Sequence, residues 1–248
     1  GAFCAFFFLS NLVQNLYLGI AIAVLVAGGL AMLIELLGYR PLLQKKARRI
    51  YLLITGLGIS TMCENLIIIC FSSRFRVYPI NFSNESINIL GASVGQIDLI
   101  IFVVSMIALI AVELFIRKSR AGLAIRGASF DLEATSLMGV NVQKLILIVF
   151  MIAGSLAGLA GALLGAKYTA FPTLGTAMTN KAFISSVFGG LGSIPGAVLG
   201  AILLGVGETM IASYVSSSMR DIFAYLLLVI VLFVRPSGLM GKEAEDKA

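Results

Sequence analysis

Long apolar runs, separated by short polar segments, set the pattern of this 248-residue chain. The runs are continuously apolar rather than alternating, and each full run is about 20 residues long, which predicts helices that cross a lipid bilayer. Spanning backbone must pair its own polar groups, which favours helices here. We predict one all-α membrane domain over 1–248, with spans at 1–13 (partial), 16–38, 51–71, 96–116, 145–165, 195–214 and 221–235, and a short piece at 182–191.

Basic residues give the predicted orientation. The loops 39–50 and 117–144 hold five Lys or Arg each, and the C-terminal end holds three more. Such positive loops lie on the cytoplasmic side of a membrane, so we expect a cytoplasmic C-terminus. If 182–191 enters from the outside and turns back, the five remaining basic residues all fall on the external side: Arg74, Arg76, Lys167, Lys181 and Arg220.

Composition agrees with a membrane protein. The chain is 59% hydrophobic and 12% charged, with a mean hydropathy of +1.03, which excludes an ordinary soluble domain. Its net charge of +6 indicates loop bias rather than nucleic-acid binding. Histidine is absent from the sequence, and Cys4, Cys63 and Cys70 lie in apolar runs without a paired spacing, so no metal or disulfide is predicted. The chain starts with half of a span and no methionine, and we expect a missing N-terminal segment.

The loop 117–144 contains a predicted short helix at Asp131–Met138. Ser129 or Asp131 can cap its N-terminus, and Gly139 stands where a left-handed C-cap belongs. A small cytoplasmic helix with spare apolar residues is suited to a groove in another protein. Three of its side chains have no predicted core to enter: Leu132, Leu137 and Met138.

Glycines four residues apart occur in two predicted helices, and such spacing lets helix backbones approach closely in lipid. Tight packing is the favoured interpretation, and helices that slide along a translocation path are the alternative. The loop between Gly189 and Gly196 breaks an apolar stretch, with Ser193 as N-cap and Pro195 in the first turn of the next helix. A plain turn is favoured there over an anion site at a helix N-terminus. The glycines concerned are Gly154, Gly158, Gly161, Gly165, Gly189, Gly190, Gly192, Gly196 and Gly200.

Acidic residues inside the spans are costly in lipid, so they are expected to face the bundle interior, water or a partner. Glu35 and Glu113 stand close to Arg40 and Arg117 in the sequence, which predicts ion pairs at the interface. For the deeper carboxylates, structural hydrogen bonding is favoured over a proton-coupling role. These carboxylates are Glu64, Asp98 and Glu208.

Several segments in this order resemble the permease subunits of branched-chain amino acid ABC importers, specifically the shorter of the two paralogous permeases. Glu133-Ala134-Thr135 followed by Gly139 is also similar to the EAA-x-x-x-G signature of ABC importer permeases, with Thr in place of the second Ala. The resembling segments are GYRPL (38–42), LMGV (137–140), KAF (181–183), GGLGSIPGAVLG (189–200), LLGVGE (203–208) and RPSGLMG (235–241).

The resemblance implies an all-α, polytopic helix bundle in the inner membrane that forms half of a translocation pathway. It implies a second permease subunit, two cytoplasmic ATPases that use ATP, and a periplasmic or lipid-anchored binding protein. The chain itself would bind no cofactor or metal and perform no covalent chemistry. Its coupling helix would include Asp131, Glu133, Ala134, Leu137, Met138 and Gly139, and Glu208 would lie on the path or in helix packing.

Three alternatives stay open at the level of the sequence. An ABC permease for urea or short amides would share the same motifs. A secondary transporter would use interior carboxylates such as Glu64 and Glu208 as proton sites, and the predicted docking helix argues against it. A passive channel or scaffold would also work without an ATPase.

Overall fold

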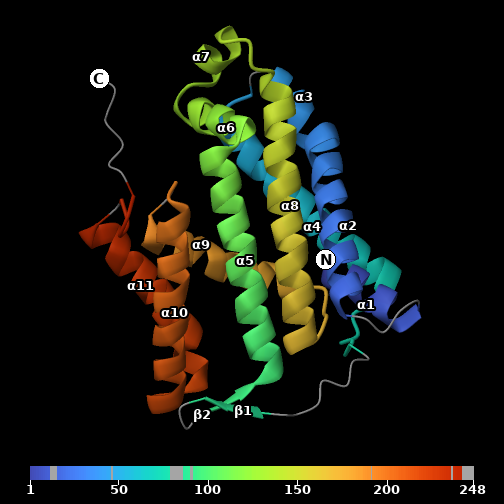
Figure 1. Ribbon diagram of the computed structural model, residues 1–248, viewed down its shortest axis with the longest axis vertical. Helices are drawn as coiled ribbons and strands as arrows, with labels where there is room; N and C mark the ends of the chain where they lie inside the picture. The colour runs from blue at the N-terminus through green and yellow to red at the C-terminus, as the bar shows by residue number, and fades with distance from the viewer. Residues whose placement is uncertain are drawn as a thin grey trace. The chain divides into compact units, whose positions relative to one another are not determined.

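A computed structural model describes residues 1–11, 16–45, 47–78, 86–89, 92–190, 192–235 and 237–241 of the chain. The fold is all-α apart from one short hairpin, as predicted (Figure 1). Residue packing divides it into two compact units, Gly1–Pro172 and Thr173–Ala248. The prediction of a single membrane domain stays a prediction.

The first unit is built around two long helices that lie side by side. Its elements are α1 (Ala2–Asn11), α2 (Leu16–Ile34), a π-helical turn η1 (Glu35–Tyr39), α3 (Arg40–Gln44), α4 (Arg49–Phe71), strands β1 (Ser86–Ile89) and β2 (Ala92–Gly95), α5 (Gln96–Lys118), α6 (Arg120–Phe130), α7 (Leu132–Leu137) and α8 (Val142–Lys167). The strands pair antiparallel, with Ser86 opposite Gly95.

Small residues allow α2 and α8 to pack closely. A Cβ atom added at Gly158 on α8 would lie 2.5 Å from the Cβ of Ala27 and 2.7 Å from the carbonyl oxygen of Ala23, both on α2. Helix α1 packs against the same pair, and its Leu9 is fully buried. The four-residue spacing of glycines in the sequence therefore corresponds to close contact between the backbones of α2 and α8.

The second unit consists of α9 (Leu174–Gly189), α10 (Ile194–Tyr214), a 3-10 turn η2 (Ser217–Met219) and α11 (Arg220–Val234). Its small core joins one buried residue from each long helix, namely Ile184, Leu204 and Ala224. The segment after α11 folds back on the end of α9, where the Leu239 amide donates to the Phe188 carbonyl at 3.0 Å. Backbone bonds of this kind fix the C-terminal turn to the α9–α10 connection.

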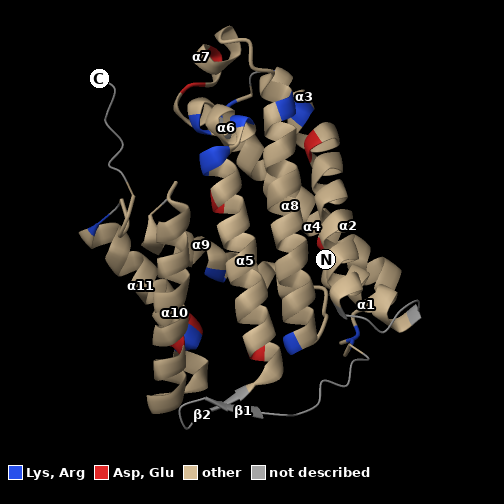
Figure 2. Ribbon diagram, viewed as in Figure 1, with Lys and Arg blue, Asp and Glu red and all other residues tan. Residues whose placement is uncertain are grey.

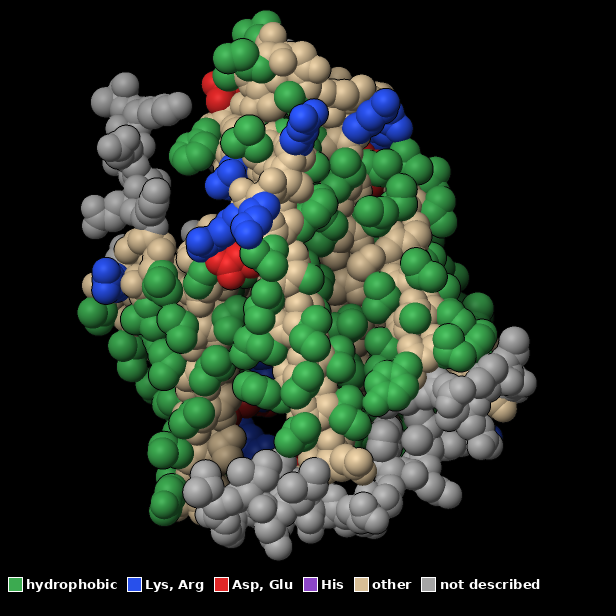
Figure 3. All heavy atoms as spheres, viewed as in Figure 1, with side chains coloured by type: hydrophobic (Ala, Val, Ile, Leu, Met, Phe, Trp, Pro, Cys, Tyr) green, Lys and Arg blue, Asp and Glu red, His purple; other side chains and the backbone are tan. Residues whose placement is uncertain are grey.

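Six helices among the described residues are long and apolar enough to cross a membrane. Their apolar side chains face outward: Leu57 and Ile69 on α4, for example, are 72% and 79% exposed. Figure 3 shows hydrophobic side chains over the long helices in view. Such surfaces suit lipid or neighbouring subunits rather than water. The six helices are Tyr17–Gln44, Ile50–Phe71, Gln96–Lys118, Val142–Lys167, Ile194–Tyr214 and Ser217–Val234.

The structure refines two of the predicted elements. Residues 182–189 of the predicted apolar piece form the second half of α9, which begins at Leu174 and ends at Gly189. The loop 117–144 contains a second helix, α6, which the sequence pattern did not predict. Residues 12–13 of the first predicted span and residue 191 lie outside the described residues. The order in which the helices cross the bilayer stays a prediction.

Candidate functional site

Basic residues of the first unit gather at the end that carries α3, α6 and α7 (Figures 1 and 2). At this end α6 and α7 follow α5 directly, and Ser119 caps α6 by accepting a 2.8 Å hydrogen bond from the Gly122 amide. The Ser119 cap was the signal for α6 that the sequence offered. At the other end of the unit, Asp98 in the first turn of α5 and Lys167 at the end of α8 form an ion pair. The distance from Asp98 Oδ1 to Lys167 Nζ is 2.6 Å.

The short helix α7 has the caps that the sequence predicts. Asp131 Oδ1 accepts hydrogen bonds from the amides of Glu133 and Ala134 at 2.8 and 3.1 Å. Ser129, the other candidate cap, donates instead to the carbonyl oxygen of Arg126. Gly139 has a φ of +81°, the left-handed conformation of a helix C-cap.

The outer face of α7 is apolar and unusually accessible. Leu137 and Met138 are each 87% exposed, and Leu132 is 48% exposed. Thr135 is the inward residue of the helix, and its hydroxyl donates to the Asp131 carbonyl at 2.7 Å. The side chain that departs from the EAA signature therefore serves internal folding, while Glu133 and Ala134 stay exposed.

The broken stretch after α9 forms a tight turn into α10. Gly190 adopts a φ of +110°, and the Ser193 hydroxyl accepts a 3.2 Å hydrogen bond from the Gly196 amide, as an N-cap does. Pro195 stands in the first turn of α10. A side chain at Gly189 would overlap the carbonyl group of Gly196, so the two helices meet backbone to backbone.

The remaining predicted glycines lie in varied surroundings. A Cβ atom at Gly161 would lie 3.2 Å from the Ala2 amide nitrogen, and one at Gly165 would lie 2.6 Å from the Tyr78 hydroxyl. Gly154 meets Ala27 and Ala31 of α2, and Gly200 meets the backbone of α9. Gly192, with a φ of +91°, has open space around it. Packing thus accounts for most of these glycines, and a role in translocation stays a prediction.

Besides Asp98, three acidic residues of the spans lie within ion-pair distance of a basic residue. Glu113 and Arg117 form the predicted ion pair at 2.7 Å. Glu208 on α10 meets the Lys181 ammonium of α9 at 2.8 Å, and Asp221 at the start of α11 lies 3.5 Å from the same nitrogen. The sequence pattern did not predict the Lys181 cluster, because its three members lie on different helices.

The predicted pair of Glu35 and Arg40 is wrong. Arg40 donates to the Gln143 side chain at 2.8 Å, whereas Glu35 is 1% exposed and its Oε2 has no hydrogen-bond partner among the described residues. Five positions separate the two residues, one more than the spacing that joins side chains on an α-helix, and the turn between them is π-helical. Glu35 therefore points into the protein and Arg40 points toward α8.

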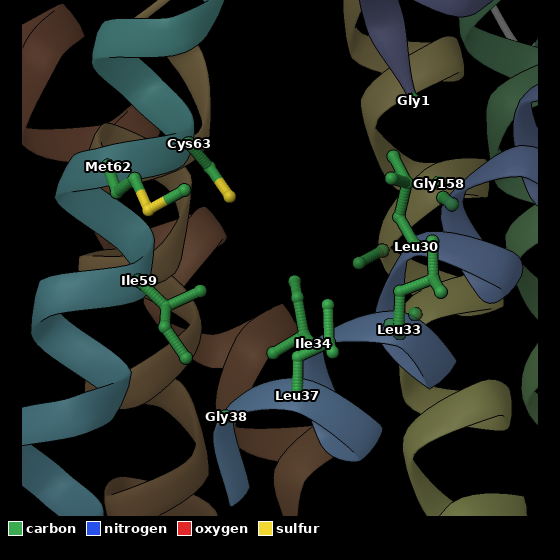
Figure 4. A pocket seen from close by; sticks show the side chains of 14 residues that line it. Gly1, Leu30, Leu33, Ile34, Leu37, Gly38, Ile59, Met62, Cys63 and Gly158 are labelled. Carbon is green, nitrogen blue, oxygen red and sulfur yellow. The ribbon is translucent and has the colours of Figure 1, made fainter.

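A cavity of about 600 Å³ opens beside Gly158 (Figure 4). Ile59, Met62 and Cys63 of α4 face Leu30 and Ile34 of α2 across it. None of its lining residues is charged, so it can hold an apolar group but cannot orient the charges of a polar ligand. Cys63, which lies in an apolar run of the sequence, lines this cavity.

The apolar helices, the capped exposed helix and the basic end together define a polytopic transport permease. Comparison with known proteins gives the family: residues 1–232 match the family described as the permease component of the branched-chain amino acid transport system. The chain belongs to this family of ABC importer permease subunits. No solved structure matches it.

Curated relatives agree along most of the sequence. The chain is 34% identical over 230 residues to the high-affinity branched-chain amino acid transport system permease protein LivH of Salmonella typhimurium, covering 91% of this chain and 74% of that protein. It has the same identity and coverage with LivH of Escherichia coli K12. It is 34% identical over 232 residues to BraD of Pseudomonas aeruginosa, covering 92% of this chain and 75% of BraD.

Proposed function

We propose that this chain carries branched-chain amino acids across the inner membrane as one half of an ATP-driven translocation pathway. A second permease subunit completes the pathway, two cytoplasmic ATPases supply the energy, and a periplasmic or lipid-anchored binding protein delivers the substrate. The chain performs no covalent chemistry and binds no cofactor, since ATP is used by its partners. The observation that carries the proposal is the capped helix α7, with Leu137 and Met138 almost fully exposed at the basic end of the unit.

Helix α7 is suited to transmit motion from an ATPase. Its apolar outer face can bind in a groove of the ATPase, and its caps stabilise the helix when the ATPase moves it. It is joined through α6 to α5 and is followed at once by α8, so a displacement of α7 reaches both long helices. The close packing of α8 on α2 then extends that movement through the unit. In the proposed orientation, the basic loops put α7 and the C-terminus on the cytoplasmic side.

Two observations favour amino acids over the alternatives. Relatives that match more than nine-tenths of the chain are named as branched-chain amino acid permeases. Glu208 is already held by Lys181, which suits binding or packing better than the free carboxylate that a proton-coupled transporter needs.

The test is uptake of labelled leucine, valine and urea into proteoliposomes that contain the complete transporter. We expect uptake of the two amino acids that requires both internal ATP and the binding protein, and no uptake of urea. Amino-acid uptake without ATP would show a secondary transporter or a channel. ATP-driven uptake of urea alone would assign the transporter to short amides.

A further inference from the structure

A second cavity, about 260 Å³ in volume, lies within the Thr173–Ala248 unit between α9 and α11. Its polar lining residues are Asn180, Lys181, Asp221 and Tyr225, and its apolar floor is formed by the buried Ile184 and Ala224. This lining differs from that of the larger cavity beside Gly158, which has no charged residue. Charge and apolar surface therefore meet in one small space.

The charged groups that line this cavity and the adjacent Glu208 are not fully paired with one another. Lys181 Nζ lies 2.8 Å from Glu208 Oε2, and Glu208 Oε1 is buried without a hydrogen-bond partner among the described residues. Asp221 Oδ1 lies 3.5 Å from the same nitrogen, longer than a normal charged hydrogen bond, and its side chain is 74% exposed. Glu208 thus fixes the Lys181 ammonium, while Asp221 stays available to another cation.

Helices α9 and α11 each carry an exposed polar residue near the cavity. Asn180 is exposed on α9, and Asp221 is exposed at the start of α11, whose other exposed side chains are largely apolar. A carboxylate facing lipid is costly, so such a residue faces water, a cavity or a partner. In the predicted topology Lys181 and Arg220 belong to the external side, which is where a binding protein releases its substrate.

We propose that the cavity between α9 and α11 binds the charged backbone of an amino acid during import, with Lys181 contacting its carboxylate and Asp221 contacting its ammonium group. This inference rests on the proposed function and names the chemistry by which the permease itself recognises a zwitterion. A lysine ammonium has three donors, so Lys181 can hold Glu208 and a substrate carboxylate together. An aliphatic side chain then packs against Ile184 and Ala224.

The first test compares uptake of leucine by the reconstituted transporter at saturating binding protein. Asp221→Asn and Lys181→Met should each lower leucine uptake about ten-fold, which corresponds to about 1.4 kcal/mol. Asp221→Glu should keep most of the uptake, because it keeps the charge. Arg220→Gln is the matched control: it removes a charge one position away from Asp221 and should leave uptake within about two-fold, since Arg220 does not line the cavity.

The second test asks whether the substrate occupies the cavity. Ala177 lines it, so Ala177→Cys is placed in a chain without Cys4, Cys63 and Cys70, and its reaction rate with a small maleimide is measured in the purified transporter. Leucine should slow the reaction. Leucinamide, which lacks the carboxylate, and 4-methylpentanoate, which lacks the ammonium group, should not, and Asp221→Asn should remove the protection.

The outcomes separate this inference from the proposed function. If the wild-type transporter takes up leucine, but Asp221→Asn and Lys181→Met transport normally, the cavity is not a binding site and the function stands. If the variants lose transport only because little folded protein is recovered, the labelling measurement decides. Equal protection of Ala177→Cys by leucine and by both analogues, or no protection by leucine, overturns the inference.

Discussion

Gly158→Ala should destabilise the permease, although alanine is among the best helix formers. The added Cβ would lie 2.5 Å from the Cβ of Ala27 and 2.7 Å from the Ala23 carbonyl oxygen, well inside the about 3.5–4.0 Å at which such atoms attract. Helices α2 and α8 must therefore move apart or shift along one another. Overpacking of this kind costs about 1–3 kcal/mol.

Part of that cost is offset, because alanine is about 1 kcal/mol better than glycine inside a helix. The net effect is a loss of up to about 2 kcal/mol. The assay is the apparent melting temperature of the detergent-purified transporter. Gly29→Ala is the matched control: Gly29 lies on α2 and has no atom within 4 Å of an added Cβ, so this variant should be as stable as wild type or more stable.

A rescue variant tests the named contact. Ala27→Gly removes one of the two atoms that an alanine at position 158 would meet, so the double variant should recover part of the melting temperature. Equal stability of Gly158→Ala and Gly29→Ala would refute the reasoning, because it would show that α2 and α8 do not pack as closely as the structure describes.

Four further variants test other parts of the structure. Glu133→Lys and Gly139→Val should insert normally and lower ATP-driven uptake at least ten-fold while ATPase activity persists, and normal uptake in both would contradict a coupling role for α7. Ser193→Cys, without the native cysteines, should react slowly with an impermeant thiol reagent and change its rate when nucleotide is trapped; fast labelling in every state would make this an ordinary loop. Glu35→Gln should raise the melting temperature, because it replaces a buried carboxylate whose Oε2 has no hydrogen-bond partner among the described residues. A lower melting temperature would contradict this and indicate that a cation binds Glu35.

Local features of the structure could be predicted from the sequence because they depend on neighbouring residues. The caps at Asp131 and Ser193 and the left-handed Gly139 each follow from a few adjacent positions. The long apolar runs predict helices within a few residues of their observed bounds, whereas the short piece at 182–191 missed the first half of α9, which begins at Leu174. Conversely, α6 was missed because it is short, and its two arginines and two glycines interrupt the apolar pattern.

Contacts between distant segments could not be predicted in the same way. Lys181, Glu208 and Asp221 lie on three helices, and no spacing in the sequence indicates that they meet. The pairing expected for Glu35 failed for a related reason, since Glu35 is buried while Arg40 bonds to Gln143, which lies 103 positions further along the chain on α8. Sequence spacing indicates that a helix has a small or charged face, whereas the partner of that face depends on the folded chain.

The proposed docking of α7 on an ATPase subunit can be measured by cysteine cross-linking. Leu137→Cys, in a chain without native cysteines, is treated with a short amine-to-thiol linker in the assembled transporter. Tyr214→Cys is the control, because Tyr214 is equally exposed at 87% but ends α10. If α7 docks on the ATPase, Leu137→Cys alone should cross-link to it, with a yield that changes when ATP is bound. Cross-linking from Tyr214→Cys and not from Leu137→Cys, in a transporter that still imports leucine, would contradict it.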